Sequence, residues 1–200
     1  MVLAGPSGAG KSRLAARLQA AHGWPILRLD DFYRDLNDPA APRSATLGIV
    51  DWDDPASWDG VAALAALEDL VCTGRASTPV YDIATSRATG TTEVTARPDD
   101  LVLAEGIFAA ELIAPLRAHG LLRAAYVIHR PPVLTFVLRL VRDLRERRKP
   151  PGVLLRRGIA LMRAEPAVVA RQVAAGGVPR PPRAVEAELG GRRAVAGPTG

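Results

Sequence analysis

A chain of 200 residues is long enough to form one domain with a buried core. Hydrophobic residues make up 48% of it and aromatic residues only 4%, so that core has to consist mainly of alanine, leucine and valine. The single cysteine, Cys72, excludes an internal disulfide bond and a metal site built from several cysteines. The chain contains no run of about 18 uncharged apolar residues, which is the length needed to span a membrane. These features predict a soluble, cytoplasmic protein with no membrane partner.

The charged residues are distributed unevenly along the chain. Residues 1–120 contain 10 basic and 16 acidic side chains, whereas residues 121–200 contain 16 basic and 5 acidic side chains. A basic half can indicate binding to nucleic acid. It can equally indicate a cleft in which one side binds phosphates while the other supplies carboxylates, and the motif described next favours this second reading.

The strongest motif is a glycine-rich stretch at residues 5–12, Gly-Pro-Ser-Gly-Ala-Gly-Lys-Ser. It fits the pattern G-x-x-x-x-G-K-[ST] of a phosphate-binding P-loop. Its glycines allow backbone N–H groups to converge on one anion, and the helix that follows adds the positive end of its dipole. The motif predicts an ATP site that comprises Gly5, Ser7, Gly8, Ala9, Gly10, Lys11, Ser12 and Arg13.

Two side chains of this motif have distinct predicted roles. Lys11 is expected to reach the β- and γ-phosphates, and the Ser12 hydroxyl is expected to ligate Mg²⁺. Residues 1–4 predict a strand before the loop and residues 12–21 a helix after it, which is the context that the motif requires. A P-loop that begins at Gly5 leaves no room for a signal peptide. The short strand before it fits a chain that starts a few residues inside that strand.

Carboxylates follow two further predicted strands. Residues 25–29 predict a strand that ends in Asp30, and the apolar residues 101–104 predict a buried parallel strand that ends in Glu105. In an open parallel sheet, residues just past the carboxyl ends of the strands face the ligand crevice. Asp30 can therefore take a proton from a substrate hydroxyl or help to hold Mg²⁺, and Glu105 can complete the magnesium shell. The alternative for either carboxylate is a solvated turn or a helix cap.

An acidic and aromatic stretch at residues 51–59 contains two tryptophans and four aspartates. Aromatic faces combined with carboxylates suit a sugar or base that has to be stacked and hydrogen-bonded. Alternatively, Ser57 or Asp59 caps the next helix and Trp58 packs beneath it. Both interpretations can hold, because Asp53 and Trp58 need not share a role.

The remaining elements continue an alternation of strands and helices. Apolar patterns predict strands over residues 91–95 and 121–128 and helices over residues 61–71, 111–118 and 152–175, the last interrupted near Pro166. Residues 34–50 read as a loop, and residues 79–87 read as irregular. Cys72 follows an apolar helical pattern and is expected to be buried and inert. His119 and His129 are expected to be structural, because no nucleophile pattern accompanies either.

The alternation predicts an α/β fold: a three-layer P-loop NTPase with a parallel sheet of about five strands and a helical lid. The predicted domain covers residues 1–177. Residues 178–200 are rich in proline and glycine and are expected to form a loose tail.

A dense group of charges lies at residues 139–149, before the Pro-Pro-Gly at 150–152. Helical spacing places Arg139 and Arg142 on one face. Such a cluster repels itself unless anions visit it, so a lid over the nucleotide at about residues 143–155 explains it better than a solvated basic face.

In their order along the chain, these motifs resemble the uridine kinase/phosphoribulokinase family of P-loop kinases. The resemblance extends from Gly5 to about Pro166. Besides the P-loop it depends on residues 30–33, 51–59, 79–87, 105–107 and 139–149.

The resemblance implies an ATP-dependent and Mg²⁺-dependent small-molecule kinase, with a role for each matching residue. Asp30 would activate the acceptor hydroxyl, and Asp53 would hold the ribose hydroxyls of a nucleoside. The implied catalytic residues are Asp30, Lys11 and Arg142. The implied acceptor-binding residues are Asp30, Tyr33, Asp53, Tyr81, Arg87 and Arg139. The implied metal ligands are Ser12, Glu105 and Asp30, and the implied lid cations on ATP are Arg147 and Lys149.

The acceptor implied by the resemblance is the 5′-hydroxyl of uridine or cytidine, but the sequence departs from the uridine kinase pattern. Those enzymes carry a Tyr-Asp-Phe-x-x-His-x-Arg stretch whose histidine contacts the pyrimidine. Residues 81–87 are one residue shorter and contain no histidine. Asp54 stands where a histidine is common, and Arg148 stands where the lid usually has glycine.

Other acceptors therefore remain open: pantothenate, a sugar phosphate or another nucleoside. A more distant alternative is a nucleotide-dependent switch or a nucleic-acid ATPase. The chain has no Asn-Lys-x-Asp motif for reading guanine, and a basic lid already explains the arginines, so nucleic acid is not the expected partner. A homo-oligomer is left open.

Overall fold

The computed structural model describes residues 1–44, 48–145 and 151–190, and its central feature is a five-stranded sheet. The strand order is β2-β5-β1-β6-β7, and every neighbouring pair is parallel. The strands are β1 (Val2–Ala4), β2 (Ile26–Arg28), β5 (Leu103–Glu105), β6 (Ala125–Ile128) and β7 (Val178–Arg180). The predicted α/β fold with a parallel sheet of about five strands is confirmed.

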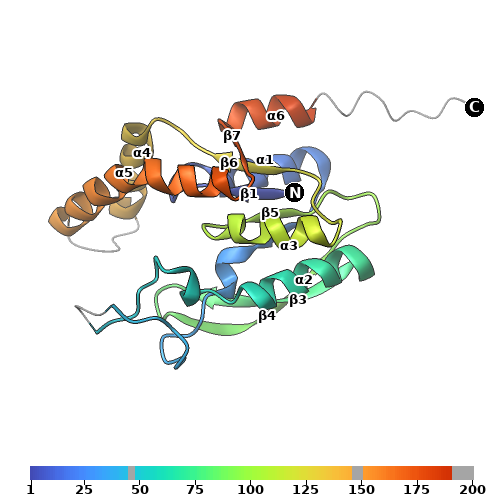
Figure 1. Cartoon of the computed structure of the whole chain (residues 1–200), viewed down its shortest axis with the longest axis horizontal. Helices are drawn as coiled ribbons and strands as arrows, with labels where there is room; N and C mark the ends of the chain where they lie inside the picture. The colour runs from blue at the N-terminus through green and yellow to red at the C-terminus, as the bar shows by residue number, and fades with distance from the viewer. Residues whose placement is uncertain (45–47, 146–150, 191–200) are drawn as a thin grey trace, which may run out of the picture.

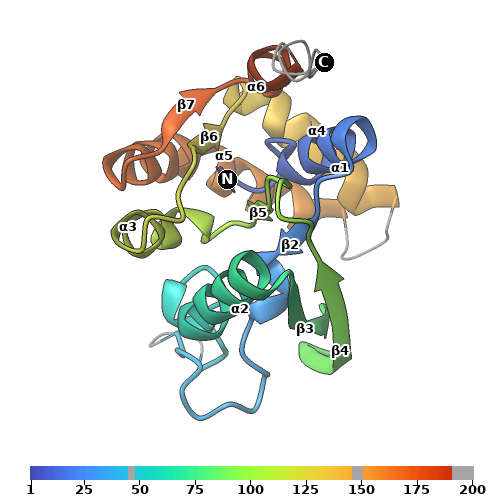
Figure 2. The ribbon, with the colours of Figure 1, turned by 90° about the vertical axis from the view of Figure 1, so that its right-hand side faces the viewer.

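Helices cover both faces of this sheet, which gives the three predicted layers (Figures 1 and 2). The helices α1 and α6 lie on one face, and α2, α3 and α5 lie towards the other. Their bounds are α1 (Lys11–His22), α2 (Gly60–Thr73), α3 (Ile113–Ala118), α4 (Pro132–Arg145), α5 (Pro151–Ala174) and α6 (Pro182–Gly190). Short 3₁₀ helices cover Leu29–Phe32, Pro55–Ser57 and Ala109–Leu112.

The central strand β1 is buried on both faces, which explains its continuous apolar sequence. Val2 and Ala4 pack into the core beneath α2 and α3, whereas Leu3 packs into the core beneath α1 and α6. Successive side chains of a strand point to opposite faces. The two cores therefore fix the register of β1, and with it the position at which the P-loop begins.

A separate antiparallel hairpin, β3 (Arg75–Asp82) and β4 (Arg87–Thr95), lies beside α2 (Figure 2). The strand predicted over residues 91–95 is confirmed and is longer than expected. The irregular reading of residues 79–87 is wrong over residues 79–82, which continue β3. The register shift between Val80 and Tyr81 explains why no clean alternation marked this strand.

The prediction of a loose tail is wrong for residues 178–190. β7 pairs with β6, and α6 packs on α1. Val185 and Leu189 have exposed fractions of 0% and 3%, and they pack with residues of α1. Two apolar side chains four residues apart are enough to dock a short helix on an existing surface, although they barely alter the overall composition. Residues 191–200 lie outside the described residues.

Two smaller predictions also change. Cys72 is exposed rather than buried. The buried stripe of α2 consists of Ala63, Ala66, Leu67 and Leu70, so position 72 falls off that stripe even though the helix is apolar on most sides. Helix α5 continues through Pro166 without the expected interruption.

No helix among the described residues is long and apolar enough to cross a membrane.

Candidate functional site

The topology brings the predicted site residues together at the carboxyl edge of the sheet. The P-loop follows β1, Asp30 follows β2, and Glu105 is the last residue of β5. These three strands are neighbours in the order β2-β5-β1. In parallel sheets this edge is where ligands bind, so the site predicted from separate stretches of sequence is one continuous region.

The P-loop has glycine at two positions where a side chain would be strained by the backbone and crowded by neighbouring elements. Gly5 has φ 141°, and a Cβ there would lie 2.3 Å from the carbonyl oxygen of Ile128 in β6. Gly8 has φ 86°, and a Cβ there would lie 3.3 Å from atoms of Thr135 in α4. The loop is thus wedged between β6 and α4, which fixes the directions of its backbone N–H groups.

Lys11 is directed into this loop. Its side chain is only 7% exposed, and Nζ donates to the carbonyl oxygens of Gly5 at 2.9 Å and Pro6 at 3.2 Å. Burial of an ammonium group is costly unless its protons are hydrogen-bonded. The loop carbonyls meet that need and hold the positive charge where phosphate oxygens would bind.

Ser12 and Glu105 meet across the site. The Ser12 hydroxyl donates to Oε2 of Glu105 at 3.2 Å. Burial raises the pKa of Glu105, the Lys11 charge opposes that rise, and the nearby Asp30 carboxylate adds to it. A hydroxyl and two carboxylates form the all-oxygen donor set that Mg²⁺ prefers. Ser12, Glu105 and Asp30 therefore fit the predicted metal site.

Asp30 is fixed against the exit of β5. Its Oδ1 accepts a hydrogen bond from the backbone N–H of Ile107 at 2.9 Å. A Cβ on Gly106 would lie 2.9 Å from the same oxygen, so glycine at 106 is what allows this approach. The adjacent Asp31 turns to a different partner, Arg28, with Nε and Oδ2 3.6 Å apart.

Aromatic side chains form one wall beside Asp30. The ring of Tyr33 lies 5.8 Å from that of Trp52 and 5.9 Å from those of Tyr81 and Phe108, measured between centroids. Burial raises the pKa of Tyr33, and the charges of Asp30 and Asp53 raise it further. Both carboxylates therefore lie near this ring. The structure brings the predicted residues Tyr33 and Tyr81 together, with Asp30 and Asp53 near Tyr33.

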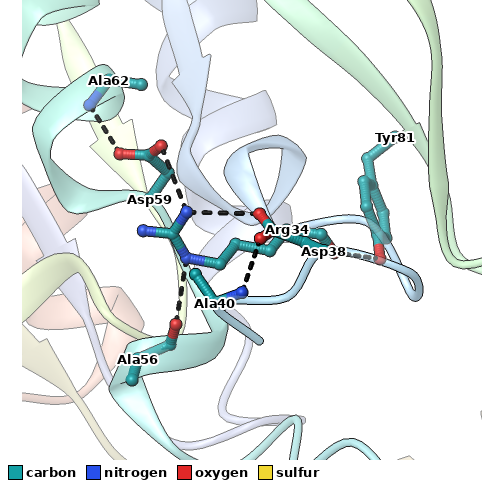
Figure 3. A network of polar contacts seen from close by, with 7 residues as sticks. All are labelled: Arg34, Asp38, Ala40, Ala56, Asp59, Ala62 and Tyr81. Carbon is teal, nitrogen blue, oxygen red and sulfur yellow. Dashed lines mark hydrogen bonds and ion pairs between the residues drawn. The ribbon is translucent and has the colours of Figure 1, made fainter. Parts of the chain in front are cut away.

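Arg34 organises the loop that carries this wall (Figure 3). Its Nη1 lies 3.3 Å from Oδ2 of Asp38 and 3.8 Å from Oδ2 of Asp59, and its Nε donates to the carbonyl oxygen of Ala56 at 3.2 Å. The Tyr81 hydroxyl donates to the Arg34 carbonyl oxygen at 3.1 Å. The sequence analysis missed Arg34, although Arg34 directly follows Tyr33, which was predicted to bind the acceptor.

The structural reading of the stretch 51–59 is confirmed for Asp59 and Trp58. Asp59 caps α2 by accepting from the Ala62 N–H at 3.0 Å. Trp58 is buried beneath the helix, and its Nε1 donates to the Leu29 carbonyl oxygen at 2.7 Å. Asp53 stays exposed. The binding of an acceptor by Asp53 stays a prediction.

Basic and polar side chains hold the P-loop from its other side. Arg139 of α4 is 6% exposed and donates through Nη2 to the Ser7 carbonyl oxygen. Arg130, just after β6, donates through Nε to the Ala9 carbonyl oxygen at 2.9 Å. Sequence reasoning placed Arg139 with the acceptor and missed Arg130. Arg130 follows a strand at the same edge as Asp30 does, so its position could have revealed it.

Five of the predicted residues are not placed in this cluster. Arg87 begins β4 and is exposed, and Arg13 is exposed on α1. Arg147 and Lys149 lie outside the described residues, and so does the side chain of Arg142.

A phosphate-binding loop, a carboxylate beside it and a magnesium-type oxygen set define a P-loop nucleotide-binding protein of the kinase type. The model of the phosphoribulokinase/uridine kinase family matches residues 1–172. The chain belongs to that family.

A solved structure shares the fold at low sequence identity. A protein from Silicibacter sp. TM1040, described as a "putative fructose transport system kinase", aligns with a TM-score of 0.60 and 22% identity, over 88% of this chain and 84% of its own. A protein from Bacillus stearothermophilus, described as a "possible uridine kinase", aligns with a TM-score of 0.48 and 20% identity, over 68% of this chain and 72% of its own. A comparison with curated proteins gives no significant match.

Proposed function

We propose that this protein transfers the γ-phosphoryl group of ATP to the 5′-hydroxyl of a pyrimidine ribonucleoside, uridine or cytidine. The observation that carries the proposal is the junction at the end of β5. There Glu105 bonds Ser12 of the P-loop, and two residues further on the Ile107 N–H bonds Asp30. Phosphate-binding and proton-accepting groups therefore meet at one turn of the chain.

The proposed chemistry follows from these side chains. Asp30 takes the proton of the attacking hydroxyl as the oxygen of that hydroxyl bonds the γ-phosphorus and the bond to the β-phosphate oxygen breaks. Because Ile107 holds Oδ1, Oδ2 is the atom available for the proton. Lys11 exchanges the carbonyl oxygens of Gly5 and Pro6 for phosphate oxygens. Mg²⁺, held by Ser12, Glu105 and Asp30, would neutralise charge on the phosphates.

The acceptor side supports a neutral substrate. Tyr33, Trp52 and Tyr81 offer faces on which a base or sugar can stack, and Asp53 offers a carboxylate for vicinal hydroxyls. Arg34 is already balanced by Asp38 and Asp59. A sugar phosphate or pantothenate would bring a further negative charge to a wall with carboxylates at Asp30 and Asp53, where repulsion opposes binding.

A neutral sugar is the second candidate. No histidine in residues 81–87 could read the pyrimidine edge, and a site without such a partner discriminates poorly between bases. The structural neighbour described as a fructose transport system kinase adds a sugar to the compounds worth testing. An anionic acceptor would depend on Arg87, which is exposed at the rim.

The deciding experiment compares kcat/KM for uridine, cytidine, 2′-deoxyuridine, fructose, pantothenate and ribulose 5-phosphate. We expect uridine and cytidine to be used about equally. 2′-Deoxyuridine should be about 10- to 150-fold poorer, because loss of a charge-assisted hydrogen bond to Asp53 is worth about 1.5–3 kcal/mol. Turnover of fructose without turnover of either ribonucleoside would mean that the acceptor is a neutral sugar rather than a nucleoside. Turnover of ribulose 5-phosphate that is lost in Arg87→Ala would establish an anionic acceptor instead.

A further inference from the structure

A buried glutamine of α5 contacts the turn that follows β5, and the proposed chemistry does not use it. Gln172 is only 3% exposed, and its Nε2 donates to the backbone carbonyl oxygen of Ile107 at 3.1 Å. The two residues are 65 positions apart in the chain, so this bond joins α5 to the exit of β5. Glutamine is mostly exposed in folded proteins, so its burial here needs a physical explanation.

The amide of Gln172 is only partly satisfied. Its Oε1 has no hydrogen-bond partner among the described residues. A buried polar atom without a partner lowers the free energy of unfolding. A methionine would fill the same space without that cost, so what glutamine adds at this position is the hydrogen bond to Ile107.

Residue 107 is held by hydrogen bonds on both sides of its Cα. Its N–H donates to Oδ1 of Asp30 at 2.9 Å, and its carbonyl oxygen accepts from Gln172. The turn also approaches Asp30 closely, because a Cβ on Gly106 would lie 2.8 Å from Cβ of Leu29 and 2.9 Å from Oδ1 of Asp30. Two printed hydrogen bonds thus connect α5, through one residue of this turn, to the proposed proton acceptor.

The end of α5 is itself anchored to the central sheet. The Gly177 N–H donates to the Gln172 carbonyl oxygen at 3.2 Å. A Cβ on Gly177 would lie 2.6 Å from Cγ2 of Val127 in β6, so the chain leaving α5 packs directly on β6. The amide of Gln172 can therefore serve as a fixed support for residue 107.

We propose that Gln172 is a positioning residue for phosphoryl transfer: it holds residue 107 so that the Ile107 N–H keeps Oδ1 of Asp30 in place and leaves Oδ2 directed at the acceptor hydroxyl. This rests on the proposed function, in which Asp30 takes the proton, but not on the identity of the acceptor. A general base has to lie within hydrogen-bond reach of the proton that it takes, and a misplacement of about 1 Å can cost about 100-fold in rate.

The first measurement needs no substrate. Hydrogen exchange followed by NMR reports how often the Ile107 N–H leaves Asp30. Gln172→Met removes the amide and keeps the chain length, so we expect this N–H to exchange about tenfold faster. Tyr126→Phe is the matched control, because it also removes a buried side-chain donor, in this case to Glu188 of α6 at 2.7 Å. It should leave the Ile107 exchange rate within about twofold of wild type.

The second measurement compares the kinetics of the same two variants, with ATP and whichever acceptor, uridine or fructose, the wild type uses. We expect kcat of Gln172→Met to fall about tenfold, with the acceptor KM and the Kd for ATP within about twofold. Tyr126→Phe should keep all three values. If Gln172 only joined α5 to the sheet, its loss would lower the unfolding temperature and leave kcat of the folded protein unchanged. That result, or a loss confined to KM or to ATP binding, would overturn the proposal.

A double-mutant cycle tests the route through Asp30. In an Asp30→Asn background, Gln172→Met should change the residual kcat by less than about twofold, because the proton acceptor through which it acts is gone. An equal loss in both backgrounds would refute the positioning role. If Gln172→Met does not fold, Gln172→Leu, a smaller apolar side chain, takes its place in every measurement.

The two measurements also separate this inference from the proposed function. An unchanged Ile107 exchange rate in Gln172→Met, with an active wild type, would count against Gln172 alone. Faster exchange at Ile107 without kinase activity in any protein, the wild type included, would count against the proposed function and, with it, against a role of Gln172 in phosphoryl transfer.

Discussion

At the residue scale, kinetics can distinguish the proposed role of Asp30 in proton transfer from a role in ATP binding. Asp30→Asn keeps the hydrogen bond from Ile107 but removes the proton acceptor. We expect kcat to fall about 10²- to 10⁴-fold, the usual contribution of general base catalysis, with ATP affinity little changed. Steady-state kinetics and ATP binding by calorimetry check this. A collapse of ATP binding would make Asp30 mainly a metal ligand.

Lys11→Ala should reduce ATP turnover without unfolding the protein. The ammonium group donates to two loop carbonyls rather than to the core, so we expect the fold to persist while ATP turnover falls at least about 10²-fold. Circular dichroism and a coupled ATPase-type assay measure the two effects. Near wild-type turnover in this variant would refute the nucleotide site as a whole.

At the scale of elements, α6 is expected to be part of the folded domain rather than an accessory. Leu189 is 3% exposed and packs in the core beneath α1. Leu189→Ala should lower the free energy of unfolding by about 2–5 kcal/mol, as buried leucine truncations do. Arg183→Ala, at an exposed position of the same helix, should change it by less than about 0.5 kcal/mol. Urea unfolding measures both, and equal values would mean that α6 does not contribute to the core.

The helical lid is a prediction at the same scale. We propose that the basic segment at residues 139–155 closes over the nucleotide, so ATP with Mg²⁺ should protect it from trypsin by at least about fivefold in cleavage rate. Salt-sensitive DNA binding without such protection would favour a nucleic-acid surface instead. Proteolysis followed by mass spectrometry and a DNA-binding titration at two salt concentrations distinguish these outcomes.

At the scale of the whole molecule, the buried carboxylate of Glu105 should lower the free energy of unfolding when no metal is bound. Its pKa is raised in the fold, so the unfolded chain loses this proton first as the pH rises. Stability is then lost from the unfolded pKa, about 4.3, up to the folded value, at about 1.4 kcal/mol per pKa unit of the shift. Glu105→Gln should therefore be more stable than wild type at pH 7, with the difference vanishing near pH 3.5.

The measurement is thermal unfolding of both proteins at several pH values, without nucleotide or Mg²⁺. The same variant should lose most of its Mg²⁺-dependent turnover, because one of three candidate ligands is gone. A Glu105→Gln protein that is less stable than wild type at pH 7 would show that the carboxylate is needed for folding, through Ser12 or Lys11, rather than for the metal.

The sequence by itself determined the P-loop, four of the five strands of the parallel sheet, and the carboxylates at the strand ends. Those features are local: a glycine pattern, a run of apolar residues and the residue after it can all be read without knowing what packs against them. The fold class and the family followed, because their motifs occur in a fixed order.

Only the tertiary structure decided which side chains serve the P-loop from behind. Arg130, just after β6, and Arg139 of α4 come from segments with no shared sequence signal, and both donate to P-loop carbonyls because β6 and α4 flank that loop. The docking of α6 was decided in the same way, since Val185 and Leu189 find their partners on α1. Long-range packing determines these contacts, and a local sequence pattern does not show which surface the segment will pack against.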